Sequence, residues 1–246
     1  MSVDLNADLG EGAEHENELL QLVTSANIAC GLHAGSAAML RASLLASKEH
    51  GVAVGAHPSF DDRENFGRRE VSLPAEEIHA LVLYQLGAFQ AVAHSLGAQP
   101  RHVKPHGALY HMAARDEAIA EAIARSVRET DPKLILFAPA SSELARMADA
   151  YDIRVACEVF ADRNYLPDGS LVPRDQPDAL LHDPETAANR VFGMLRDNCV
   201  RAVDGTHVRV QVDTICVHGD TPGAVQFAQQ LRLALHQMGV MVAPTT

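Results

Sequence analysis

Short apolar segments alternate with longer segments of helical spacing along the chain. The apolar segments read as strands and cover residues 2–6, 25–29, 52–56, 102–104, 134–138, 155–158 and 214–217. Helices are predicted where a capping residue or a proline opens a helical pattern and a glycine follows it. The clearest predicted helices extend from Ser36 to near Gly51, from Ser72 and Pro74 to near Gly97, over residues 184–197 and over residues 222–237.

This alternation predicts an α/β fold with a parallel sheet and helices outside it. Seven strands are nearly enough to close a ring, so we expect a (β/α) barrel of about seven parallel strands. An open doubly wound sheet remains the alternative, because periodicity does not reveal closure. No linker divides the 246 residues, so residues 1–246 are expected to form a single barrel domain.

Composition and charge narrow the function classes. Aromatic residues make up only 4% and Trp is absent, so the core must use Ala, Val, Leu and Ile. The net charge of -12 disfavours nucleic-acid and membrane-surface partners. The first residues lack a secretory pattern and the four cysteines are scattered, so we expect a cytoplasmic protein with buried, reduced cysteines.

Two long polar segments interrupt the pattern, at residues 57–74 and 160–177. Both are rich in Asp, Arg, Pro and Gly. Loops of this length in one domain are typical of lids or binding loops, with ordinary surface loops as the alternative.

Titratable side chains gather where the predicted strands end. In a barrel these ends meet at one rim, so residues distant in sequence should share one pocket. Clustering such groups is costly unless they bind or react with something. They could move protons or hold a divalent metal, and the sequence does not decide between these. The strand-end residues are Asn6, Asp8, Glu11, His33, His57, Lys104, His106, Glu158, Asp162, Arg163, His218 and Asp220.

Several well-known motifs are missing. The sequence has no GxxxxGK[ST] or GxGxxG phosphate loop, no GxSxG serine elbow and no HExxH or CxxC ligand pair. A nucleotide cradle within this chain and a serine-triad hydrolase are therefore not expected.

Six segments resemble the LamB/YcsF family in the family's own order, from Asp4 to Val225. They read VDLNADLGEG, SANIACGLHAGS, VGAHPSFDDRENFGRRE, HVKPHGALY, EVFADRNYLPDGSLVPR and TICVHGDTPGAV. The resemblance implies a barrel related to the glycoside hydrolase/deacetylase superfamily. It also implies the role of the A component of an ATP-dependent 5-oxoprolinase. That enzyme opens 5-oxo-L-proline, a small anion, to L-glutamate together with subunits B and C, and the partners would handle ATP largely themselves.

One departure from the family pattern matters. The second segment usually reads HAGD, and this chain has Ser36 in place of the Asp. Both residues can cap a helix. A negative charge is lost, which matters only if that Asp binds a metal or takes a proton in relatives.

The resemblance and the strand-end pattern together suggest roles. Asp8 and Glu158 are predicted to activate water or bind metal, and His33, His57 and His106 to transfer protons or ligate metal. Lys104 is predicted to hold the substrate carboxylate or the oxyanion. A metal, if present, would use Asp8, His33 and His57. Predicted substrate-binding residues are Asn6, Arg68, Arg69, Arg163, His218 and Asp220.

Two other functions remain open. The chain could be a stand-alone metal-dependent amidase or deacetylase, which needs neither ATP nor partners. It could also be a non-catalytic subunit that presents 5-oxo-L-proline to B and C.

Overall fold

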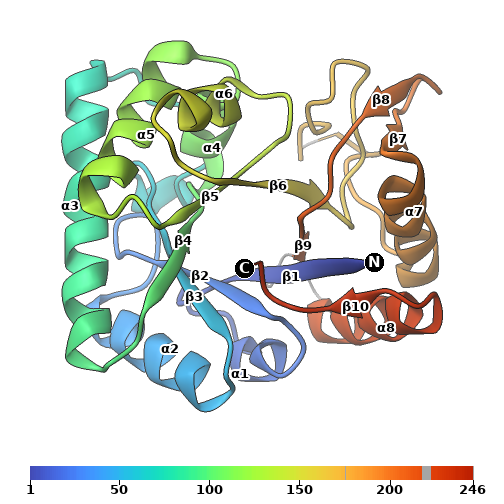
Figure 1. Cartoon of the computed structure of the whole chain (residues 1–246), viewed down its shortest axis with the longest axis horizontal. Helices are drawn as coiled ribbons and strands as arrows, with labels where there is room; N and C mark the ends of the chain where they lie inside the picture. The colour runs from blue at the N-terminus through green and yellow to red at the C-terminus, as the bar shows by residue number, and fades with distance from the viewer. Residues whose placement is uncertain (175, 218–222, 246) are drawn as a thin grey trace.

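Seven parallel strands close into a barrel in the computed structural model, which describes residues 1–174, 176–217 and 223–245 (Figure 1). The strands are β1 (Ser2–Leu9), β2 (Ser25–Ala29), β3 (Ala53–His57), β4 (Pro100–Val103), β5 (Ile135–Ala138), β6 (Val155–Phe160) and β9 (Thr214–Val217). Neighbours pair in that order, and β9 also pairs with β1. The predicted barrel is confirmed, and the open-sheet alternative is wrong because the ring has no free edge.

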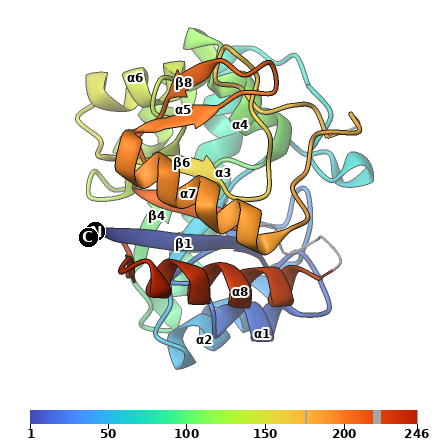
Figure 2. The ribbon, with the colours of Figure 1, turned by 90° about the vertical axis from the view of Figure 1, so that its right-hand side faces the viewer.

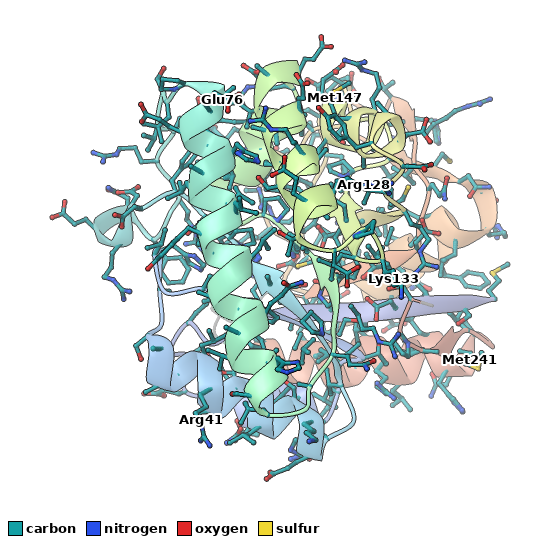
Figure 3. All side chains as sticks on the ribbon, turned by 60° about the vertical axis from the view of Figure 1, so that its left-hand side comes forward. Arg41, Glu76, Arg128, Lys133, Met147 and Met241 are labelled. Atoms are coloured by element: carbon teal, nitrogen blue, oxygen red, sulfur yellow. The ribbon has the colours of Figure 1, made fainter. Side chains whose placement is uncertain are left out.

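Helices surround the strands. They are α1 (Glu16–Leu20), α2 (Ala37–Glu49), α3 (Ala75–Ser95), α4 (Gly107–Ala113), α5 (Glu117–Thr130), α6 (Glu143–Ala150), α7 (Pro184–Asp197) and α8 (Ala224–Gln237), with a short 3-10 helix, η1 (Arg63–Asn65). Helices α7 and α8 flank β1 in Figure 2. Figure 3 shows α3 and α5 side by side, where Glu76 pairs with Arg125 at 2.7 Å. No helix in the described residues has the length and apolar character needed to cross a membrane.

The predicted elements agree closely with the observed ones. Strand β1 extends three residues beyond the prediction, to Leu9, because its polar residues point into the barrel rather than ending the strand. Ser36 caps α2 by accepting the Met39 N–H, as predicted. The hairpin of β7 (Cys199–Arg201) and β8 (His207–Arg209) was not predicted, although an Asp-Gly turn lies between them, and neither was the two-residue β10 (Met241–Val242).

Buried residues alternate between two environments along each barrel strand. In β1, Leu5, Ala7 and Leu9 belong to the hydrophobic core, whereas Asn6 is equally buried but polar. Successive strand residues point to opposite faces, so the polar set faces the barrel interior and the apolar set faces the helices. The same division holds in β9, where Ile215 joins the core.

Polar side chains cross the seam where the ring closes. Thr214 of β9 donates its hydroxyl to Asp4 of β1 at 2.5 Å, and the Asn6 amide donates to Thr214 at 2.7 Å. Asn27 of β2 donates to Asn6 at 2.7 Å. This layer satisfies buried polar groups and joins the first, second and last barrel strands.

His102 lies buried in the barrel interior. Its Nε2 is 2.8 Å from Oδ1 of Asn27, and its ring stacks on Phe137 with 4.2 Å between centroids. Gly55 of β3 lies so close that a Cβ there would overlap the imidazole. Burial lowers the pKa of His102 to about 3, and the Lys104 charge acts in the same direction. The neutral ring therefore donates to Asn27.

Gly55→Ala should lower the free energy of unfolding by about 1–3 kcal/mol, because Asn27 and Phe137 keep the His102 ring from moving away. Urea denaturation measures the change. Gly87→Ala is the matched control, since a Cβ on this exposed face of α3 meets nothing within 4 Å. It should stabilise the protein by about 0.5–1 kcal/mol. An unchanged urea midpoint for Gly55→Ala would show that the interior has spare room.

His102 should make the protein less stable in acid. Its folded pKa of about 3 lies below the ordinary 6.5, so the unfolded chain binds a proton that the folded chain excludes. The stability from the neutral ring is complete above 6.5 and is lost as the pH falls toward 3. His102→Gln should reduce the slope of unfolding free energy against pH by about 1.4 kcal/mol per unit in this range.

The control for this slope is His94→Gln, at an exposed position of α3, which should leave the slope unchanged. If His102→Gln does not fold, NMR titration of the wild-type ring gives the same information. A His102 midpoint near 6.5 contradicts the prediction.

Candidate functional site

Eight of the predicted strand-end residues meet at the carboxyl ends of β1, β2, β3, β4 and β6. All barrel strands are parallel, so these ends form one rim, and short connections carry the functional groups over it. Hydrogen bonds, ion pairs and ring contacts link the residues into a continuous network. The structure brings together Asn6, Asp8, Glu11, His33, His57, Lys104, His106 and Glu158.

A tight turn after β1 carries Glu11. Gly10 and Gly12 have φ angles of 72° and 92°, in the left-handed region that favours glycine. The Glu16 carboxylate accepts four backbone N–H bonds at 2.9–3.2 Å, from Gly10, Glu11, Gly12 and Ala13. These bonds fix the turn, so the backbone determines where the Glu11 side chain begins.

His33 lies in the loop after β2 and has a partner at each ring nitrogen. Nδ1 is 2.8 Å from the Ser59 hydroxyl, and Nε2 is 3.0 Å from the Glu11 carboxylate. The ring stacks on His106 with 3.9 Å between centroids and 6° between planes. Ser59 belongs to the long loop after β3, so this loop positions a residue of the site.

His57 ends β3, and His106 immediately precedes α4. Nδ1 of His57 lies 2.6 Å from the Lys104 carbonyl oxygen, and Nε2 of His106 lies 2.9 Å from the Phe66 carbonyl oxygen. The two remaining ring nitrogens, Nε2 of His57 and Nδ1 of His106, are 2.9 Å apart. Both rings are therefore oriented by the backbone and face each other.

Four residues could hold a metal ion. Glu11, His33, His57 and His106 each offer one ligand atom, and these atoms lie within 4.8 Å of one another. Asp8, a metal candidate from the sequence, lies beside this group with Oδ1 3.5 Å from Nε2 of His57. Imidazole and carboxylate groups are common ligands of divalent transition metals.

Two imidazoles of this group, those of His33 and His106, are held neutral. Burial lowers the pKa of His33 to about 3, and the charge of His57 adds to the effect. Burial, with His57 and His33 nearby, also lowers the pKa of His106 well below its ordinary value. Neutral imidazole is the form that accepts a proton or binds a metal.

Lys104 lies between two carboxylates. Its ammonium is 3.0 Å from Asp8 and 2.9 Å from Glu158, and the Asn6 amide donates to Glu158 at 3.0 Å. Burial would lower the pKa of Lys104, but the charges of Asp8 and Glu158 hold it well above its usual value. The Asp8 side chain is 11% exposed and that of Glu158 0%, so Asp8 is the carboxylate that can meet a substrate.

Two further side chains that the sequence pattern did not single out lie beside the Lys104–Glu158 pair. Cys216 of β9 lies with its sulfur 3.1 Å from Nζ of Lys104. Tyr110 of α4 is buried, and burial together with the charge of Glu158 raises its pKa well above the ordinary value. Tyr110 lies one helical turn after His106, and this i, i+4 spacing was the available signal.

Two arginines of the loop after β3 lie on the surface. The Arg68 guanidinium sits over the Phe66 ring, 4.9 Å from its centroid. Arg69 is exposed and lies 3.5 Å from Asp62. Their predicted contact with an anionic substrate stays a prediction.

Other predicted substrate-binding residues follow β6 and β9. Arg163 is buried and donates to the Val172 carbonyl at 2.6 Å within its own loop. Burial lowers the pKa of Arg163 to about 10. His218 and Asp220 lie outside the described residues.

This arrangement can perform acid–base and electrophilic chemistry. Asp8 can take a proton from water, and the buried Lys104 cation can stabilise negative charge. Glu11 was expected at the end of β1 but was not predicted as a metal ligand. A Gly-Glu-Gly sequence is equally typical of a surface turn.

Comparison with known proteins identifies the chain's relatives. The model of the LamB/YcsF family matches residues 3–246. The chain belongs to the LamB/YcsF family. The lactam utilization protein from Thermus thermophilus is 45% identical over 99% of each chain, with a TM-score of 0.91. The predicted family is confirmed over nearly the whole chain.

More distant structural neighbours share the barrel of this LamB/YcsF protein. A family 4 carbohydrate esterase from Streptomyces lividans, solved with acetate, is 11% identical with a TM-score of 0.51, over 100% of this chain and 93% of its own. A deacetylase solved with substrate is 17% identical with a TM-score of 0.50, over 98% of this chain and 87% of its own. These likenesses confirm the deacetylase-like barrel fold.

The departure at Ser36 leaves the local fold intact. Its side chain is exposed and accepts the Met39 N–H at 3.2 Å, which caps α2 as an Asp would. Capping is therefore retained in this member of the LamB/YcsF family.

Lys104→Met should lower the free energy of unfolding by about 3–5 kcal/mol, because it leaves two carboxylates without their buried cation. Chemical denaturation measures this loss. Adding Glu158→Gln should recover part of it by removing one of those charges. Lys48→Met, at an exposed site, is the control and should change little. A loss no larger than the control's would mean that Lys104 does not hold these carboxylates in place.

Proposed function

We propose that this chain is the A component of an ATP-dependent 5-oxoprolinase and hydrolyses the cyclic amide of 5-oxo-L-proline to give L-glutamate. Subunits B and C are the proposed partners, and ATP is the co-substrate. Membership of the LamB/YcsF family and the relative described as a lactam utilization protein support a lactam as substrate. A cytoplasmic location stays a prediction.

The convergence of Asp8, neutral imidazoles and Lys104 at one rim carries the proposal. A lactam carbonyl is resonance-stabilised, so its opening needs a deprotonated water, stabilisation of the oxyanion and a proton for the leaving nitrogen. Asp8 would take the proton from water. Lys104 would stabilise the oxygen or hold the substrate carboxylate, and Glu158 would keep Lys104 in position.

ATP coupling requires a phosphorylated species. The partner subunits would transfer the γ-phosphoryl group of ATP to the lactam oxygen, releasing ADP. At the rim of the barrel, water would add to the ring carbon, the nitrogen would take a proton and the C–N bond would break. This leaves a γ-glutamyl phosphate, which a second water hydrolyses to glutamate and phosphate. The absence of a phosphate-loop motif from the sequence agrees with this division.

A second function is favoured by one observation. The three imidazoles and one carboxylate that could hold a metal would also suit a stand-alone metal-dependent amidase or deacetylase. Such an enzyme would work without ATP or partner subunits.

Reconstitution distinguishes these functions. This chain, mixed with its B and C subunits, 5-oxo-L-proline and ATP, should form glutamate, whereas the single chain should not. Asp8→Asn and His106→Gln should each lower the rate by about 100-fold or more, because Asp8 is the proposed base and His106 belongs to the histidine cluster beside it. His94→Gln should retain the full rate, since His94 is exposed on α3.

Three outcomes would contradict the proposal. Full activity in both site variants would refute the site assignment. Amide hydrolysis by the lone chain without ATP would favour the stand-alone enzyme. Loss of 5-oxoproline binding in the variants, with a normal rate at saturating substrate, would favour a non-catalytic substrate-binding role.

A further inference from the structure

We propose that Glu11, His33, His57 and His106 bind one divalent transition-metal ion. The proposal rests on the tautomers that the fold imposes on three histidines. It does not depend on which substrate the protein uses.

The partners of His57 and His106 determine where their protons lie. A backbone carbonyl oxygen only accepts hydrogen bonds, so Nδ1 of His57, 2.6 Å from the Lys104 oxygen, carries a hydrogen. For the same reason Nε2 of His106, 2.9 Å from the Phe66 oxygen, carries one. When both rings are neutral, the two nitrogens that face each other at 2.9 Å therefore both present lone pairs.

His33 repeats this arrangement. The Ser59 hydroxyl donates to the Phe60 carbonyl at 3.0 Å, so its oxygen accepts from Nδ1–H of His33 at 2.8 Å. Nε2 of His33 then presents a lone pair to the Glu11 carboxylate oxygen at 3.0 Å. All three rings thus direct their N–H groups outward and their lone pairs inward.

The inward lone pairs of the three rings and the Glu11 carboxylate repel one another. This arrangement is unfavourable unless a positive charge lies among them. One proton could bridge the His57 and His106 nitrogens, but it would leave the contact between His33 and Glu11 repulsive. A single cation among the four groups relieves both contacts at once. The same outward N–H bonds to carbonyl and hydroxyl oxygens are those that orient histidine ligands in metalloproteins.

The distances suit one ion. Ligand atoms around a tetrahedral zinc lie about 3.3 Å apart, given zinc–nitrogen bonds near 2.0 Å. Here the Glu11 oxygen lies 3.0, 3.5 and 3.9 Å from the facing nitrogens of His33, His106 and His57. The spacings from the carboxylate oxygen bracket the ideal value, and all four ligand atoms lie within 4.8 Å of one another, so small side-chain shifts would complete the coordination.

The donor set indicates the class of metal. Three imidazole nitrogens and one carboxylate oxygen favour zinc, iron, nickel or copper over magnesium and calcium, which prefer oxygen ligands. Asp8 lies next to the proposed ion, with Oδ1 3.5 Å from Nε2 of His57, and the side chain is partly exposed. A water or a carbonyl oxygen on the ion would therefore lie within reach of a carboxylate base.

Metal content and calorimetry on the isolated chain test the proposal. Protein purified without chelator should contain about one equivalent of a transition metal per chain, measured by mass spectrometry of the elements. After chelator dialysis, zinc chloride should bind with a stoichiometry of one, and magnesium chloride should give no saturable heat. Glu11→Gln, His33→Gln and His106→Gln should each weaken zinc binding by more than about 100-fold.

Glu14→Gln and His94→Gln are the matched controls, because both residues are exposed and neither belongs to the cluster. Circular dichroism checks that each variant folds. If a ligand variant does not fold, cobalt substitution of the wild-type chain supplies the test, since its visible absorption reports nitrogen and oxygen ligands.

Absence of both retained metal and saturable zinc binding would overturn the proposal, and the four groups would then share protons. Equal zinc affinity in the ligand variants and controls would mean an adventitious ion only. None of these measurements needs substrate, ATP or partner subunits. An inactive complex that binds zinc would therefore refute the proposed function and leave the metal site standing.

Discussion

The pairing of β1 with β9 is the constraint on which this structure depends. It turns a row of parallel strands into a ring, and only in a ring do the carboxyl ends of β1, β3, β4 and β6 face one another. The seam is reinforced from inside, where Asp4, Asn6 and Thr214 satisfy one another by hydrogen bonds. Because buried polar groups are costly when unpaired, this layer also specifies the register in which the ring closes.

A polar barrel interior has consequences for the rim. Lys104 follows β4 directly. Its positive charge is stabilised by ion pairs with one carboxylate in the barrel interior and another at the rim. The interior carboxylate, Glu158, is inaccessible and anchors the cation. Asp8 is partly exposed and remains able to meet a ligand, so the same ion pair both stabilises the barrel and presents a reactive group.

The site has two halves that are built differently. The lysine half comes from two strand residues, Asp8 and Glu158, and from Lys104 directly after β4, and it is fixed by ion pairs. The histidine half lies at strand ends and in loops, and its rings are oriented by the carbonyl oxygens of Phe66 and Lys104 and by the Ser59 hydroxyl. Asp8 touches both halves, at Lys104 and at His57. Any ligand that bridges them would therefore lie against Asp8.

The sequence by itself determined which apolar segments form strands and which reactive residues follow each strand. Local periodicity and turn residues encode this, which is why His33, His57 and Lys104 could be named. Only the tertiary structure decided that β9 pairs with β1, that Glu11 rather than Asp8 shares a possible metal site with the histidines, and which ring nitrogens face inward. These depend on contacts between residues far apart in the chain, and no local pattern records such contacts.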